Sequence, residues 1–344
     1  MAYAAKLVNV VGVLCKEEST YGTAIAVAGA ADTIQPWYTD RGGLPVNLGY
    51  LYDGDLGGAP GNLGEIRHGV PYGGAMTCEL PFFFKGGGAA YSASVVPSLH
   101  KQWKASGFTA AVVVTGRAET WTYTPTLDSV IPTSLTTEFY TDDEKYPSWG
   151  GLLNWKFSGD TTGYIRHTFS WNAIKGTVAS SASSVAAGFT YPLAAVVPTT
   201  AVGSTVTLGL YTPAIGVKSV DFDLGRTLNP RAGLDAADGH LGFTAQGRKP
   251  RLTVTVEKTA MITTPFNSSA GLDAIELWES GINFACSFQH AGAQYFKWKL
   301  NMPQAMLVAP PERVNMNGVA CWKLVVGPYN TTPAAQDDLT VLCD

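Results

Sequence analysis

Charge is scarce in this sequence. Charged residues make up only 15% of its 344 residues, against a usual share of about 25%. The net charge is −4, and no basic tract is longer than two residues. Because proteins that adhere to nucleic acids normally carry a basic excess, the composition argues against that class. Much of the surface must instead be Ser, Thr, Gly and apolar, and such a surface often packs against other protein.

Cysteine motifs and long apolar runs are missing too. None of the five cysteines forms a C-x-x-C pair or a zinc spacing, so we interpret them as reduced, buried thiols. No apolar run approaches about 18 residues, so no segment is predicted to span a bilayer. The apolar run 7–15 resembles part of a signal peptide, but the charges of Lys16, Glu17 and Glu18 follow it, and we expect a first strand there. The cysteines are Cys15, Cys78, Cys286, Cys321 and Cys343.

The usual signatures of catalysis are also absent. The sequence has no P-loop, no dinucleotide glycine fingerprint and no G-x-S-x-G. Asp53 and Asp55 fit the first positions of a calcium loop, but Gly57 and Gly64 stand where later oxygen ligands belong. We therefore predict no enzyme, no cofactor and no metal site. The histidines, which show neither metal spacing nor pairing with cysteine, are His68, His100, His167, His240 and His290.

Strand signals dominate what the sequence does contain. Short segments rich in Val, Thr, Phe, Tyr and Trp alternate polar with apolar residues, and 38 glycines and 20 prolines supply the turns between them. The predicted fold class is mainly β. The predicted strands are 77–84, 110–116, 120–124, 154–159, 205–212, 219–225, 251–258, 294–300 and 321–327.

Two segments have a helical pattern instead. The segment 97–107 begins with Pro97 and Ser98 and ends at a glycine, and the segment 269–281 also ends at a glycine. Proline at the start and glycine at the end are typical helix boundaries. Each predicted helix carries a tryptophan near its last turn, Trp103 in one and Trp278 in the other.

Three features recur in the same order along the chain. Their spacings of 167, 168 and 175 residues are close to half the length, as a tandem duplication with loop insertions would give. The alternative is that Gly, Trp and Asp-rich turns recur by composition in any β protein. The features are Gly-x-x-x-Trp-Lys at 151–156 and 318–323, Asp-x-Asp-Leu-Gly at 53–57 and 221–225, and the helix tryptophans Trp103 and Trp278.

A stretch of small, uncharged residues separates the two copies. Residues 176–200 are rich in Ala, Ser, Val and Thr, which favours a linker. The predicted organisation is a first β domain over 1–175, a linker and start of the second copy over 176–204, and a second β domain over 205–344.

Several blocks resemble the tail tube proteins of long-tailed bacteriophages. In the block 219–258, a strand ending in Asp-Leu-Gly runs into a loop with proline and acidic residues, and then an Arg-Lys-Pro leads a strand. The block 14–24 is similar to the start of that family, with Lys16, Glu17, Tyr21 and Gly22 in the expected order. The block 134–159 resembles a strand-loop-strand pattern of the same family. The blocks touch both halves of the chain.

The resemblance implies a fold and an assembly. It implies β-sandwich or barrel domains, each with a short flanking α-helix, and rings that stack into a virion tail tube. Because family members with one such domain form hexameric rings, a chain with two copies could close as a trimer with a pseudo-hexameric wall, with a hexamer as the alternative. The implied partners are further copies of the chain and the tape measure, tail terminator and distal tail proteins. Double-stranded DNA would pass through the lumen without specific binding, assembly would take place in the bacterial host cytoplasm, and no membrane is involved.

Candidate functional residues follow from the repeated motifs. The long loops after each Asp-x-Asp-Leu-Gly, 57–73 and 225–248, are candidates for contacts between rings, and we expect them to order on stacking. The four tryptophans of the repeats are candidate core positions. The stacking candidates are Asp53, Asp55, Pro60, Glu65, Arg67, Asp221, Asp223, Arg226, Pro230 and Arg231; the core candidates are Trp103, Trp155, Trp278 and Trp322.

Two other classes of function remain as alternatives. A two-domain β-sandwich adhesin or carbohydrate-binding module would use exposed aromatic side chains as stacking platforms, and the chain has 9 Trp and 15 Tyr. A glycoside hydrolase would need two carboxylates at a set separation, which no motif here promotes.

Overall fold

The computed structural model confirms a mainly β protein. It describes residues 12–34, 46–48, 75–84, 91–93, 95–115, 118–126, 130–140, 144–161, 163–177, 179–180, 201–209, 216–233, 240–258, 266–267, 271–292, 297–332 and 335–343. No helix in these ranges is long and apolar enough to cross a membrane. The cysteines within them are buried and free, as predicted.

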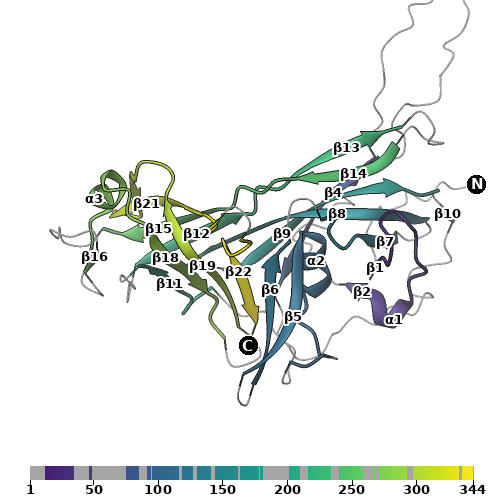
Figure 1. Cartoon of the computed structure of the whole chain (residues 1–344), viewed down its shortest axis with the longest axis horizontal. Helices are drawn as coiled ribbons and strands as arrows, with labels where there is room; N and C mark the ends of the chain where they lie inside the picture. Colours follow the sequence, from purple (N-terminus) through teal and green to yellow (C-terminus); the bar gives the residue numbers. More distant parts are fainter. Residues whose placement is uncertain are drawn as a thin grey trace, which may run out of the picture.

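The first half of the chain contributes the right-hand part of the view in Figure 1. Its elements are β1 (Gly12–Glu17), α1 (Gly29–Asp32), β2 (Thr33–Ile34), β3 (Val46–Leu48), β4 (Ala75–Phe83), α2 (His100–Ala105), β5 (Phe108–Thr115), β6 (Ala118–Pro125), β7 (Leu135–Tyr140), β8 (Glu144–Asp160), β9 (Arg166–Lys175) and β10 (Ala179–Ser180).

The second half supplies the left-hand part of the view and a ribbon that reaches back over the first half. Its elements are β11 (Thr205–Leu208), β12 (Val217–Asp223), β13 (Thr227–Ala232), β14 (His240–Gln246), β15 (Arg251–Glu257), β16 (Phe266–Asn267), β17 (Gly271–Leu272), α3 (Ala274–Glu279), β18 (Phe284–Gln289), β19 (Trp298–Leu307), β20 (Glu312–Met316), β21 (Val319–Pro328) and β22 (Thr340–Cys343).

The predicted strands and both predicted helices are present, with shifted ends. Within the run 7–15, residues 12–15 belong to β1, and the residues before them lie outside the described ranges. The helix α3 begins where Asp273 accepts hydrogen bonds from the Ile275 and Glu276 amides, at 3.1 Å each. It ends just before Gly281, whose φ of +60° favours glycine. Most of the predicted linker, residues 181–200, lies outside the described residues.

Strands of the two halves are hydrogen-bonded to each other at two seams. The long strand β8 pairs along one edge first with β7 and then, over Lys156–Asp160, with β12 of the second half. The strand β22 lies between β19 of its own half and β6 of the first. The sheet therefore runs through β4, β9, β8, β12, β15 and β21 without a break.

Part of the element order recurs in the two halves, from β4 in the first and from β15 in the second. In each half a strand, a helix, a hairpin and a second hairpin follow one another, and the pairings β3–β4, β5–β6 and β7–β8 have counterparts in β12–β15, β18–β19 and β20–β21. The last strands differ. The strand β9 lies between β8 and β4 of its own half, whereas β22 lies between β19 and β6 of the other half, and β21 pairs directly with β15.

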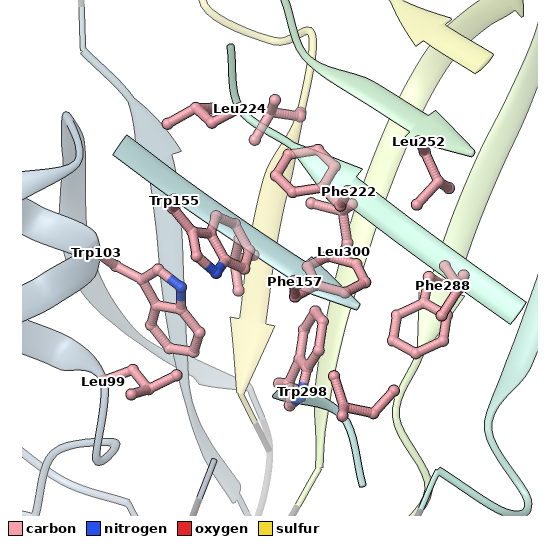
Figure 2. Close-up of a cluster of buried hydrophobic side chains, with 14 of the residues drawn as sticks. Leu99, Trp103, Trp155, Phe157, Phe222, Leu224, Leu252, Phe288, Trp298 and Leu300 are labelled. Carbon is pink, nitrogen blue, oxygen red and sulfur yellow. The ribbon is translucent and has the colours of Figure 1, made fainter. Parts of the chain in front are cut away.

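One aromatic core extends under both seams (Figure 2). Trp103 of α2 meets Trp155 of β8 edge to face, with ring centroids 5.7 Å apart. Trp155 also contacts Phe222 of β12 at 5.0 Å. Phe157, two residues along β8, contacts Trp298 of β19 at 4.9 Å. Because alternate residues of β8 point into this core, its remaining side chains form part of the opposite, polar face.

Candidate assembly surfaces

The Asp-x-Asp-Leu-Gly motif at 221–225 forms the end of β12 and a tight turn. The Asp223 carboxylate accepts hydrogen bonds from the Gly225 amide at 2.7 Å and from Asn154 Nδ2 at 3.2 Å. It also pairs with Lys156 Nζ at 3.2 Å. Gly225 has φ of +64°, and a Cβ there would lie 2.5 Å from the Lys249 carbonyl oxygen. The motif therefore ends β12 in a tight turn, and its Asp223 side chain joins the second half to β8.

Arg226, predicted as a stacking residue, is buried between the two halves. Its guanidinium Nη1 donates a 2.7 Å hydrogen bond to the Ser106 carbonyl oxygen at the end of α2, and its side chain lies against Gly107. A Cβ on Gly107 would lie 1.4 Å from that Nη1. A cation at a helix C-terminus complements the free carbonyl groups there. Arg226 thus holds α2 from the opposite half of the chain.

The predicted second stacking loop is a formed ribbon in the single chain. The strands β13 and β14 pair with each other and contact β8 and β9, and they project to the upper right in Figure 1. Pro230 and Arg231 are exposed on it. In the single chain the segment 225–248 already contains this pairing, and residues 234–239 lie outside the described ranges; the role of the segment in stacking stays a prediction.

Tyr21 anchors this ribbon to the first half. Its hydroxyl donates to the Phe243 carbonyl oxygen at 2.8 Å and accepts from the Phe243 amide at 2.7 Å. The neighbouring Gly242 has φ of +112°, and a Cβ there would lie 2.5 Å from the hydroxyl oxygen. Burial raises the pKa of Tyr21 above its ordinary value, so the hydroxyl stays protonated and can make both bonds.

Glu18 holds the loop that carries Tyr21. Its buried carboxylate accepts four hydrogen bonds: from the Gly22 and Gly150 amides at 2.9 and 2.7 Å, and from the Ser134 and Thr136 hydroxyls at 2.6 and 2.9 Å. Sequence reasoning did not select Glu18. The available signal was a glutamate inside the turn-forming run Glu-Ser-Thr-Tyr-Gly, where a carboxylate can satisfy free amides.

A polar sheet face continues across the β8–β12 seam. The outward residues of β4, β9, β8 and β12 are mostly hydroxyl, amide or charged, while their neighbours are buried in the core. Among the outward residues listed next, four side chains are acidic and two are basic. The outward residues are Thr77, Glu79, Pro81, Phe83, Asn154, Lys156, Ser158, Asp160, Arg166, Thr168, Ser170, Asn172, Ile174, Ser219, Asp221 and Asp223.

This face has a hollow of about 410 Å³ at the seam, lined by residues of β8, β9, β12 and the turn between β8 and β9. Asp221, another predicted stacking residue, lines it together with Asp160, Arg166 and Tyr164. Burial raises the pKa of Asp221, Lys323 opposes the rise, and Asp160 adds to it. The two carboxylates are thus close enough to influence each other.

The four repeat tryptophans have unequal surroundings. Trp103 and Trp155 are fully buried and touch each other. Trp322 is buried at the start of β21, with Arg313 and Lys258 over its ring at 5.2 and 5.6 Å. Trp278 is half-buried on α3. The first pair therefore forms one cluster, whereas Trp278 and Trp322, both among the described residues, make no ring contact with each other.

The predicted first stacking loop cannot be placed. Asp53, Asp55, Pro60, Glu65 and Arg67 all lie outside the described residues.

Among the residues that are described, no group of three His, Cys, Asp or Glu side chains could hold a metal ion. Neither a protein-family model nor a curated protein matches the sequence. Function is therefore inferred from the surfaces of the chain itself.

Proposed function

We propose that this chain is a structural virion protein that polymerises into stacked rings and forms the tail tube of a long-tailed phage. The observation that carries the proposal is the polar sheet face that continues from β4 to β12 through the β8–β12 seam, with the aromatic core behind it. A tube wall needs such a surface, because a lumen that conducts DNA must be polar without holding phosphates.

The charge on this face suits a conduit. Glu79, Asp160, Asp221 and Asp223 stand against Lys156 and Arg166, and Lys156 is paired with Asp223 at 3.2 Å. Several free Lys or Arg side chains would retain a duplex in a strongly salt-dependent way. We propose that this face lines the lumen and that DNA passes along it without specific binding.

Ring closure would use the two halves as two wall units. The two halves share part of their element order, and we propose that they arose by tandem duplication, so that three chains would give six units; a hexamer of chains is the alternative. Among the described strands, β5 pairs only with β6 and β11 only with β18. Such edges can pair with a neighbouring chain. The β13–β14 ribbon, with Pro230 and Arg231 exposed, would contact the next ring.

The partners and location follow from this assembly. We propose that the tape measure, tail terminator and distal tail proteins meet the tube, and that the chain resides in the virion tail after assembly in the bacterial host cytoplasm. No membrane takes part.

Electron microscopy tests the proposal. Purified chain, alone and with tail-initiation components, should give rods or rings by negative stain, and a view down the ring axis should show three chains with six wall units. Shortening the ribbon by removing 231–241 should leave rings and abolish rods. A protein that stays monomeric at high concentration with those components present contradicts the proposal.

A carbohydrate-binding role has one observation in its favour. Tyr164 is 41% exposed and lines the hollow with Arg166 and two aspartates, an arrangement that could stack and hydrogen-bond a sugar. Against it, no tryptophan among the described residues is exposed. Calorimetric titration with oligosaccharides, repeated on Tyr164→Ala, separates this role from the tube: binding that Tyr164→Ala abolishes would favour it.

A further inference from the structure

The strand β22 closes the second seam by filling a slot between strands of different halves. Val341, Leu342 and Cys343 pair with Tyr123, Thr122 and Trp121 of β6 along one edge. Along the other edge the same strand pairs with residues 298–301 of β19. Four residues therefore pair with β19, and three of them also pair with β6.

Alternate side chains of this segment insert into the core. Leu339, Val341 and Cys343 are each 0% exposed, whereas Thr340 and Leu342 between them are only half-buried. This two-residue alternation, with backbone ladders on both edges, is how an extended strand completes another protein's sheet. Without the segment, β6 and β19 would both present open edges above unfilled core positions.

The segment that connects β21 to β22 forms no part of the slot. The strand β22 does not pair with β21, which precedes it, unlike β9, which pairs with its predecessor β8. Instead, the approach is held by side chains. Arg248 makes hydrogen bonds of 3.1 and 2.8 Å to the two oxygens of Asp338 and one of 2.8 Å to Gln336 Oε1. It also donates to the Thr126 carbonyl oxygen at 3.1 Å.

The connection itself is a loop closed on itself by side chains. Asp337 accepts from the Thr331 amide at 3.0 Å and from the Thr331 hydroxyl, and Asn330 Oδ1 accepts from the Asp338 amide at 3.1 Å. Residues 329–339 could span roughly 36 Å when extended, at about 3.3 Å per residue. Opening these side-chain bonds together with the two ladders of β22 would free the segment and leave the other sheet pairings in place.

We propose that residues 336–343 are a donor strand that a second copy of this chain can supply to the slot between β6 and β19. The slot recognises the same residues from either source, so exchange between copies conserves every contact of β22 and changes only which chain provides it. The resulting partner is a neighbouring copy, linked by its own last strand. The proposal goes beyond the tube and holds for any assembly in which copies are close.

Disulfide trapping across the slot tests the exchange. Leu342 and Thr122 are cross-strand partners, at a separation that suits a disulfide. One full-length copy carries Thr122→Cys, and a second copy with a mass tag carries Leu342→Cys. After the two are mixed and mildly oxidised, a mixed disulfide dimer should form in at least several-fold excess over either variant alone.

The control shifts the register by two residues. Thr340 pairs with Asn301 of β19 and with no residue of β6, so Thr340→Cys mixed with Thr122→Cys should give only background.

Arg248→Lys, which loses the bidentate contact with Asp338, should speed the formation of the specific dimer several-fold. A chain carrying both Thr122→Cys and Leu342→Cys, kept dilute, should crosslink within itself, which verifies folding and register. The proposal is overturned if no mixed dimer forms, or if the control pair gives as much dimer as the specific pair. Either result counts whether or not the protein forms tubes.

Discussion

The helices α2 and α3 occupy the same place in the element order but very different surroundings. In α2, Trp103 is fully buried, Lys104 pairs with Glu17 of β1, and Lys101 pairs with Asp32 of α1 at 3.1 Å. In α3, Ile275 is 40% exposed and Trp278 is half-buried. The first helix is enclosed by β1, α1 and Arg226 of the second half, so a similar place in the element order does not produce equal burial.

The first half depends on the second half for part of its packing. The first half receives β12, Arg226, the β13–β14 ribbon and β22 from the second half. Elements of the second half therefore complete the core of the first half and the packing around α2. We expect substitutions at corresponding places to cost more free energy of unfolding in the first half than in the second.

The two strand tryptophans should show the largest difference. Trp155→Ala removes the centre of the shared aromatic core and should lower the free energy of unfolding by about 3–5 kcal/mol. Trp322→Ala, at a site shared with Arg313 and Lys258, should lower it by about half as much. Urea unfolding of both variants, followed by circular dichroism, measures the difference. Equal losses would mean that the two sites are equivalent.

Arg226 tests how far the second half supports α2. Arg226→Ala leaves the Ser106 carbonyl oxygen without this buried donor and should cost about 2–4 kcal/mol. The matched control is Arg231→Ala on the exposed ribbon, which should change the free energy of unfolding by less than about 0.5 kcal/mol. Hydrogen exchange in α2 should accelerate only in the first variant; unchanged exchange there would contradict the role assigned to Arg226.

Two histidines make the first half sensitive to acid. Burial, with a smaller contribution from His290, lowers the pKa of His167 well below its ordinary value. Burial also lowers the pKa of His100 to about 4, although Glu17 opposes the shift. Since the unfolded chain binds these protons more readily, their contribution to stability is present above about pH 6.5 and is lost as pH falls.

The expected slope is about 1.4 kcal/mol per pH unit for each histidine, and the part due to His100 should level off near pH 4. The groups facing His167 are Trp155, whose Nε1 donates to it at 3.1 Å, and the rings of Trp103, Phe157 and Trp298. His167→Gln should remove one histidine's share of the slope between pH 6.5 and 4. A slope unchanged by this substitution would show that His167 is not the group that titrates.

Tyr21→Phe should cost less stability than Trp155→Ala or Arg226→Ala. Tyr21→Phe leaves the Phe243 amide and carbonyl without their shared partner and should cost about 1–2 kcal/mol. Because the loss is local to the ribbon, amide exchange in β13 and β14 should rise while exchange in β15 stays unchanged. Exchange that rises equally in β15 would mean that the ribbon is not an independent unit.

Local patterns predicted the elements well. Alternation of polar and apolar residues placed strands such as β15 and β21, and helix boundaries placed α2 and α3, because these signals depend on a few neighbouring residues. The buried, reduced cysteines also followed from their spacing. The seams did not follow, because alternation says which side chains share a face but not which edge a strand will meet.

Individual site residues also have partners that local sequence patterns do not reveal. Arg226 was selected as part of an exposed loop because it follows Asp-Leu-Gly, yet its side chain turns inward to the end of α2. Glu18 was overlooked because its four donors come from segments up to 132 residues away. Partners at that separation in sequence leave no periodic trace near the residue itself.

The amino-acid sequence by itself determined a mainly β chain with two of its short helices and a composition poor in charge, since propensity and periodicity act over short distances. Only the tertiary structure decided that β12 and β22 cross into the first half, that one aromatic core lies under both seams, and that a polar face runs over them. Strand edges are chemically alike along their backbones, so their pairing is settled by the packing of side chains brought together from distant parts of the chain.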